Sequence, residues 1–220
     1  THFDEVNDKA KYYKDGKEVD PYLIFKNNGI TYSRLRLWVD PFSKDGKPYG
    51  AGTNDLKTTI KLAKLMQNYG FHLYLDFHYS DFWADPSKQF IPKSWVGLSL
   101  EELIKKIYEY TYETLTIFKK EGIHFDAIQT GNEITNGMLW PIGKLKDNPD
   151  GSRSNYKSLF SLLRSAGKAV RDFDKNIKII IHLESAHQKN KWIEYFTYLE
   201  SHHLDYDYVG TSYYSYWHGT

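Results

Sequence analysis

The sequence of 220 residues contains no cysteine, which excludes a disulfide framework and thiolate metal sites. The lack of cysteine does not indicate in which cellular compartment the protein works. No apolar run approaches the roughly 20 residues that a membrane-spanning helix needs, and the polar N-terminus has no signal-peptide core, which predicts a mature or trimmed chain. An excess of one charge is lacking too, because 29 basic and 28 acidic residues give a net charge of +1. Nucleic acid and anionic membranes are therefore not favoured as partners, and a neutral or polar substrate fits better.

Aromatic residues, by contrast, are abundant. They make up 17% of the chain, with 19 Tyr and 6 Trp, which is more than a hydrophobic core needs. Flat rings with polar tips suit stacking against the C–H faces of sugars, and a tyrosine-rich outer shell is the plainer alternative. Composition alone leaves both interpretations open.

Five short β-rich segments are separated by stretches with helical periodicity. Asn54 is predicted to cap the first helix, and Ser99 with Glu102 forms a capping box that predicts the start of the second. Two more helices are predicted over residues 154–173 and 188–201. The predicted strands cover residues 30–39, 71–79, 125–133, 177–184 and 206–217. Alternating strands and helices predict a parallel sheet built from right-handed βαβ units.

The remaining choice is between an open sheet and a barrel. No glycine-rich phosphate loop follows any predicted strand, so a nucleotide-binding open sheet loses its main support. Polar and aromatic residues gather where the strands end, which is where a (β/α)8 barrel keeps its active site. We find no repeat or linker, so residues 1–220 are predicted to form one domain. Five strands, however, do not close an eight-stranded barrel.

Glu133 is the first candidate for chemistry. It ends the third predicted strand in the stretch IQTGNEITNG, directly after Asn132. In a concave, aromatic-walled site, desolvation disfavours a charged carboxylate, which is the tuning that a general acid needs. Asn132 offers an amide to a substrate hydroxyl. The alternative is that Glu133 only caps the helix that follows.

A second group lies in the stretch LDFHYSDFW. Asp76 and His78 share one face of a strand, and Asp81 follows in the loop. This pattern is compatible with a metal site or with sugar binding around a catalytic acid. Because no second strand offers a His-x-His partner and both His182 and His218 are isolated, we favour sugar binding.

Arg34, Arg36 and Trp38 also share one strand face. Arginines inside a barrel are costly unless carboxylates near the rim pair with them. Arg36 lies nearer the strand end and is the better candidate for keeping a catalytic carboxylate ionised. The alternative is that this face points outward toward the helices.

Four phrases, in this order and spacing, resemble one known family. They are RLRLWVDP, LYLDFHYSDFWADPSKQ, IQTGNEITNGMLWPIG and TSYYSYWHGT. Nearly the whole chain is similar to the arabinogalactan endo-β-1,4-galactanases of glycoside hydrolase family 53. The resemblance implies a retaining (β/α)8 barrel, of which this chain is a segment that covers strands two to six and is truncated at both ends.

The resemblance also implies roles for single residues. Glu133 is expected to be the general acid/base, with Asn132 beside it. The other residues expected to line the substrate cleft are Arg36, His78, Asp81, Trp83, Trp140, His182 and Tyr214. Glu184 departs from the family pattern, and we expect it to form a salt bridge on the outside.

A retaining hydrolase needs a second carboxyl group as nucleophile. In this family it is a glutamate at the end of the seventh strand, which would lie beyond residue 220, so this segment alone should be inactive. No metal or other cofactor is expected within the segment, and a calcium site known in some members would lie beyond its end. The resemblance implies an extracellular monomer that acts on pectic galactan or type I arabinogalactan, with no nucleic-acid or membrane partner. The rivals are a mannanase or cellulase of the same clan and a non-catalytic carbohydrate-binding protein.

Overall fold

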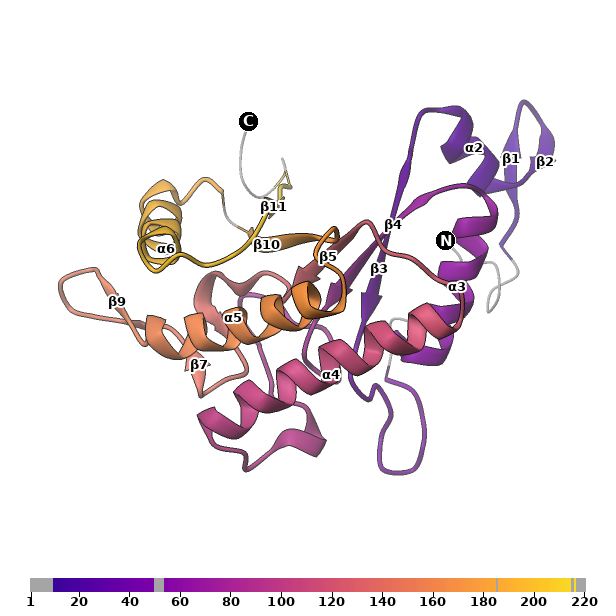
Figure 1. Ribbon diagram of the computed structural model, residues 1–220. Coiled ribbons are helices and arrows are strands. Elements are labelled where there is room, and N and C mark those ends of the chain that lie inside the picture. The colour runs from indigo at the N-terminus through magenta and orange to yellow at the C-terminus, as the bar shows by residue number, and fades with distance from the viewer. Residues whose placement is uncertain (1–9, 50–53, 185, 215, 217–220) are drawn as a thin grey trace.

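The computed structural model describes residues 10–49, 54–184, 186–214 and 216. Its centre is a sheet of five parallel strands in the order β11-β10-β5-β4-β3 (Figure 1). The strands are β3 (Tyr32–Leu37), β4 (His72–Phe77), β5 (Ala127–Thr130), β10 (Lys178–Glu184) and β11 (Tyr208–Ser212). Each strand lies within one of the five segments predicted from the sequence and is shorter than that segment. Residues 213, 214 and 216 do not belong to the last strand, and residues 215 and 217 of that prediction lie outside the described residues.

One long helix joins each consecutive pair of these strands. The helices are α3 (Leu56–Asn68), α4 (Leu100–Lys120), α5 (Tyr156–Phe173) and α6 (Lys189–Ser201). The capping box at the start of α4 is confirmed, since Ser99 and Glu102 each accept the other's backbone N–H. The prediction for α3 is wrong by one residue, because Asp55 rather than Asn54 caps it by accepting the N–H of Thr58. No helix in the described part of the chain is long and apolar enough to cross a membrane.

Short elements fill the connections. An antiparallel hairpin of β1 (Tyr12–Lys14) and β2 (Lys17–Val19) precedes α2 (Pro21–Asn27), which Asp20 caps. The loop after β4 holds the 3-10 turn η1 (Lys93–Trp95). The loop after β5 contains η2 (Ile134–Asn136), β6 (Gly137–Met138), β7 (Gly143–Lys144), β8 (Lys146–Asp147) and β9 (Arg153–Ser154). We had not predicted these elements.

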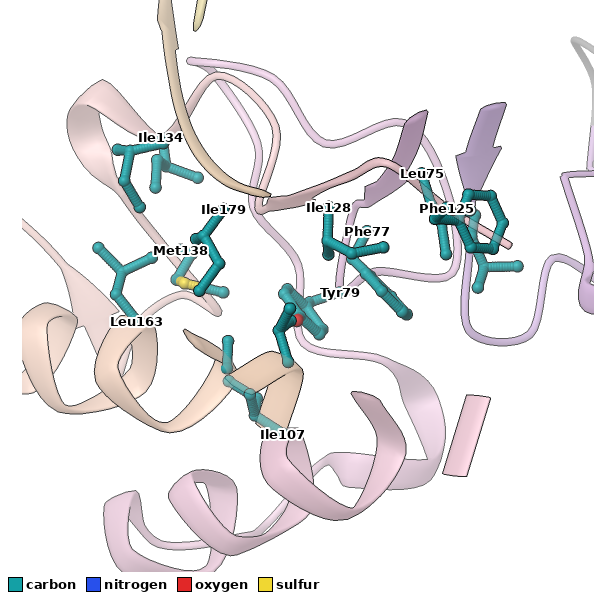
Figure 2. Close-up of a cluster of buried hydrophobic side chains, with 14 of the residues drawn as sticks. Leu75, Phe77, Tyr79, Ile107, Phe125, Ile128, Ile134, Met138, Leu163 and Ile179 are labelled. Carbon is teal, nitrogen blue, oxygen red and sulfur yellow. The ribbon is translucent and has the colours of Figure 1, made fainter. Parts of the chain in front are cut away.

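The two faces of the sheet differ in chemistry. The outer face, which packs against the helices, consists of apolar residues at alternate strand positions: Leu35, Leu37, Leu73, Leu75, Phe77, Ile128, Ile179, Ile181 and Leu183. Figure 2 shows Phe77, Ile128 and Ile179 of this face in one cluster with Ile107 of α4 and Leu163 of α5. Helices α4 and α5 also pack against each other (Figure 1). This face is the hydrophobic core.

The inner face carries the residues between those of the outer face, and most are polar. They are Arg34, Arg36, Tyr74, Asp76, Gln129, His182, Glu184 and Ser212. The strand register places Arg36 opposite Asp76 and Asp76 opposite Gln129. The alternative that the arginine face points toward the helices is therefore wrong, and polar groups from all five strands meet on the inner face.

Candidate active site

Glu133 lies just beyond the end of β5 with a left-handed backbone, at φ 51° and ψ 51°. Gly131 before it also has a positive φ, of 102°, so the chain leaves the extended conformation directly after Thr130. A left-handed conformation is unfavourable for a residue with a side chain. Glu133 stands at the N-cap position of η2, as the helix-cap alternative expected, but its side chain makes no capping hydrogen bond there. Capping therefore does not explain the carboxylate.

The Glu133 carboxylate instead lies beside β11. The Ser212 hydroxyl donates to Glu133 Oε1 at 2.6 Å. The backbone N–H of Glu133 donates to His182 Nδ1 at 3.1 Å, and His182 Nε2 lies 3.2 Å from Ser212 Oγ. Strands β10 and β11 thus hold both the backbone and the side chain of Glu133.

His182 is buried and neutral at ordinary pH. Burial lowers the pKa of its imidazole to about 4, and the positive charge of Arg34 adds to this effect. A backbone N–H can only donate, so Nδ1 must be the unprotonated nitrogen and the ring proton is on Nε2. Both ring nitrogens are therefore engaged with protein atoms.

Asn132, directly before Glu133, is buried and tightly held. Its Oδ1 accepts from Arg34 Nη2 at 2.9 Å, and its Nδ2 donates to the backbone oxygen of Ala84 at 2.8 Å. Gln89 donates to the backbone oxygens of both Asn132 and Glu133, at 2.9 and 3.3 Å. The loops after β4 and β5 therefore fix the Asn-Glu pair together.

An ion pair between the fully buried Asp76 and the partly exposed Arg34 lies next to Asn132. Asp76 Oδ2 is 2.8 Å from Arg34 Nη2 and 3.0 Å from His78 Nε2, while the N–H of Ala84 donates to His78 Nδ1. Burial opposes ionisation of Asp76, but His78 and Arg34 outweigh it and hold the pKa of this carboxyl below its usual range. We had expected Arg36 to keep a catalytic carboxylate ionised; among the described residues, the arginine that pairs with a carboxylate of the inner face is Arg34, and its partner is Asp76. The His78 side chain is buried, and both of its ring nitrogens have hydrogen-bond partners in the protein.

Asp81 connects the loops that follow β3 and β4. Its two oxygens accept the backbone N–H groups of Asp40, at 3.0 Å, and of Lys93, at 2.8 Å. Lys93 Nζ in turn lies 2.7 Å from Asp40 Oδ2. Burial raises the pKa of Asp81 despite these contacts. Asp81 therefore holds the loop after β3 and the loop after β4 together at the rim of the site.

Aromatic rings line the rim around these groups. The Arg36 guanidinium lies over the Trp83 ring at 4.4 Å, and Lys144 Nζ lies over the Trp140 ring at 4.1 Å. Trp140 Nε1 donates to the backbone oxygen of Asn136 at 3.1 Å, which fixes the indole. Tyr214 is 57% exposed and lies close enough for its hydroxyl to influence the pKa of Arg36. Because these residues come from opposite ends of the strand order, β3 and the segment after β11, the sheet is curled.

Glu184 does not behave as predicted. It is only 7% exposed, and it accepts a hydrogen bond from Thr135 Oγ1 at 2.9 Å instead of forming a salt bridge on the outside. Burial raises the pKa of Glu184 to about 6, and the nearby charge of Glu133 contributes. The prediction failed because Thr135 belongs to η2, 49 residues away, and covers the end of β10.

The described residues contain no group of three or more His, Cys, Asp or Glu side chains that could hold a metal ion. In the Asp76–His78 pair, the histidine nitrogen that could bind a metal is hydrogen-bonded to the carboxylate.

Comparison with known proteins establishes the family of this chain. The family model described as glycosyl hydrolase family 53 matches residues 2–220. The chain belongs to glycosyl hydrolase family 53. The Ignisphaera aggregans GH53 catalytic domain, a solved structure, is 40% identical with a TM-score of 0.89, covering 100% of this chain and 58% of that one.

Two named galactanases are also similar to this chain. The endo-beta-1,4-galactanase of Bacillus subtilis (strain 168) is 34% identical over 209 residues, which are 95% of this chain and 46% of the relative. The probable arabinogalactan endo-beta-1,4-galactanase A of Aspergillus tubingensis is 38% identical over 201 residues, which are 88% and 53% of the two chains. The chain spans about half the length of these relatives. The predicted fold, an incomplete (β/α)8 barrel of this family, is confirmed.

Sequence reasoning missed several residues of the site. Ser212, Gln129 and Gln89 were not singled out, and Arg34 was ranked below Arg36. Gln129 had one detectable signal, since it is a long polar residue in the middle of the short predicted strand segment FDAIQTGNE, and the structure buries it completely. Nothing in the sequence connects Ser212 with Glu133, which is 79 positions away.

Proposed function

We propose that this chain is the part of an endo-acting β-1,4-galactanase that carries the general acid/base, Glu133. The observation that supports this most is the position of Glu133 at the carboxyl end of β5, on the polar inner face, with its backbone and carboxylate held by His182 and Ser212. The relatives named as galactanases supply the substrate class, the internal β-1,4 bonds of galactan or arabinogalactan.

In this proposal Glu133 donates a proton to the glycosidic oxygen as the bond breaks, and then takes a proton from water when the glycosyl intermediate is hydrolysed. A retaining mechanism requires a second carboxyl about 5 to 5.5 Å away as nucleophile. We assign that carboxyl to polypeptide outside these 220 residues. Glu184 is not suited to the role, since Thr135 covers it and burial disfavours its charged form.

The other site residues divide into two groups in this proposal. Arg36, Trp83, Trp140 and Tyr214 are assigned to substrate contact, because their guanidinium or rings reach the rim. Asn132, His78, Asp81 and His182 act by holding other residues, since they are largely buried or bonded to protein atoms. From membership of this family we also propose an extracellular monomer that needs no cofactor in this region.

The proposal is tested by assaying the full-length protein on β-1,4-galactan, β-mannan and cellulose. We expect shortened oligosaccharides from galactan only, with a rapid fall in viscosity that marks internal cleavage. Cleavage of mannan or cellulose in preference to galactan would overturn the substrate assignment. Binding to galactan without any cleavage would overturn the assignment as an enzyme.

A further inference from the structure

Three residues around the acid/base form a closed ring of hydrogen bonds. The Glu133 N–H donates to His182 Nδ1, His182 Nε2 faces the Ser212 hydroxyl, and that hydroxyl faces Glu133 Oε1. The first bond has only one possible direction, because a backbone amide cannot accept. The imidazole proton is therefore on Nε2 and is donated to Ser212 Oγ.

The direction of the third bond follows from the second. Since Ser212 Oγ accepts from His182, its own proton is free for Glu133 Oε1, 2.6 Å away. Oε1 then acts as an acceptor whether or not Glu133 is protonated. The proton that an acid/base transfers must therefore reside on the other oxygen, Oε2.

The strands are built to accommodate this ring. His182 and Ser212 lie on the inner face of adjacent parallel strands, and the register places Gly210 directly opposite His182. A Cβ atom at position 210 would lie 3.1 Å from His182 Cδ2, which is tighter than an ordinary contact. Glycine at this position therefore leaves room for the imidazole to reach both partners.

We propose that Ser212 and His182 are positioning residues for the acid/base, which orient the Glu133 carboxyl group and assign its transferable proton to Oε2. This inference rests on the proposed role of Glu133 and goes beyond it. The low pKa of His182, about 4, agrees with a ring that stays neutral and does not compete as a proton donor. Neither residue touches the glycosidic bond in this account.

Other charged groups also face Glu133. Arg34 reaches it from β3 with its partner Asp76 on β4, and Glu184 approaches from β10. These groups stay in place when only Ser212 is changed. A change in pH dependence on replacing Ser212 therefore reports the Ser212 hydroxyl itself.

The test compares Ser212→Ala with Ser212→Thr in the full-length enzyme, using the pH dependence of kcat/KM on galactan. Removing the hydroxyl takes a donor from the carboxylate and makes its ionised form less favoured. We expect the alkaline limb of the Ser212→Ala profile to move up by about one pH unit, with about a tenfold lower rate at the optimum. Ser212→Thr retains a hydroxyl and should restore the position of the limb. Thr211→Ala, on the opposite face of the same strand, is the matched control and should leave the profile unchanged.

A spectroscopic measurement provides a second readout. The ¹⁵N resonances of His182 should report the Nε2–H tautomer from about pH 5 upward, in wild type and in Ser212→Thr. The Nδ1–H tautomer would overturn the inference. So would an alkaline limb that does not move in an active Ser212→Ala enzyme. A wild-type protein that leaves galactan uncut would instead refute the proposed function, so the two failures are distinguishable.

Discussion

The two faces of the five-stranded sheet use the same strands for different purposes. Phe77 and Asp76 are neighbours on β4 and are both fully buried, yet one packs among apolar side chains and the other forms an ion pair. The outer face is held by burial of apolar area, which tolerates many sequences. The inner face is held by directed bonds, each of which needs a particular partner. Changes on the first face should therefore alter stability, and changes on the second should alter the geometry of the site.

The largest effect is expected on the outer face. Phe77 is stacked on Tyr79 with centroids 5.4 Å apart and is completely buried. Phe77→Ala should lower the free energy of unfolding by about 4 kcal/mol, through lost burial and the cavity that remains. Urea denaturation of the full-length protein measures this. A loss below about 1 kcal/mol would show that the outer face is not the main core.

Asp76→Asn, one residue away, tests the inner face. It leaves Arg34 without its carboxylate partner. Because the Arg34 side chain is 37% exposed and water can partly solvate its charge, we expect a loss of about 2 kcal/mol at pH 7 together with reduced activity. Because the folded-state pKa of Asp76 is lowered, its contribution is complete above the unfolded-state pKa of about 3.9. It is lost as pH falls through the folded-state pKa. The difference between wild type and variant should therefore shrink in strong acid, and a difference that does not depend on pH would argue against the ion pair.

Glu184→Gln should raise the stability of the fold, whereas Asp76→Asn should lower it. Its folded-state pKa is raised to about 6, so the buried carboxylate costs stability as pH rises from the unfolded-state value of about 4.5 to 6. Glutamine keeps an acceptor for Thr135 without the charge. We expect the variant to be about 1 to 2 kcal/mol more stable than wild type at pH 7 and similar to it at pH 4. A loss of stability at pH 7 would contradict the assignment.

Two glycine substitutions give the smallest effects and a direct contrast. Gly210→Ala crowds His182 and should lower kcat several-fold at a cost of about 1 kcal/mol or less. Gly167→Ala lies on α5, where the added Cβ would make only ordinary contacts at 3.5 and 3.6 Å. It should stabilise the helix by about 0.5 to 1 kcal/mol and leave kcat unchanged. If Gly210→Ala and Gly167→Ala changed kcat equally, the space beside His182 would have no special role in catalysis.

The outer face could largely be predicted from the sequence. Its apolar residues repeat at the spacing of strands and helices, and the capping residues of α4 lie three positions apart, so local pattern is sufficient. The inner face could not be predicted in the same way. Ser212 meets Glu133, Thr135 meets Glu184 and Arg34 meets Asn132 across 79, 49 and 98 positions, and these contacts exist only once the strands are side by side. The position of Glu133 was predictable because the resemblance to a family supplied it, whereas the residues that hold it were not.

The central claim is that Glu133 is the general acid/base. The most direct measurement compares Glu133→Ala with wild type in the full-length enzyme, on galactan and on an aryl β-galactoside with an activated leaving group. We predict a loss of about 10² to 10⁴ in kcat/KM on galactan and a far smaller loss on the aryl galactoside, which needs no proton to depart. An equal loss on both substrates, with the fold intact, would contradict the account and make Glu133 a structural residue.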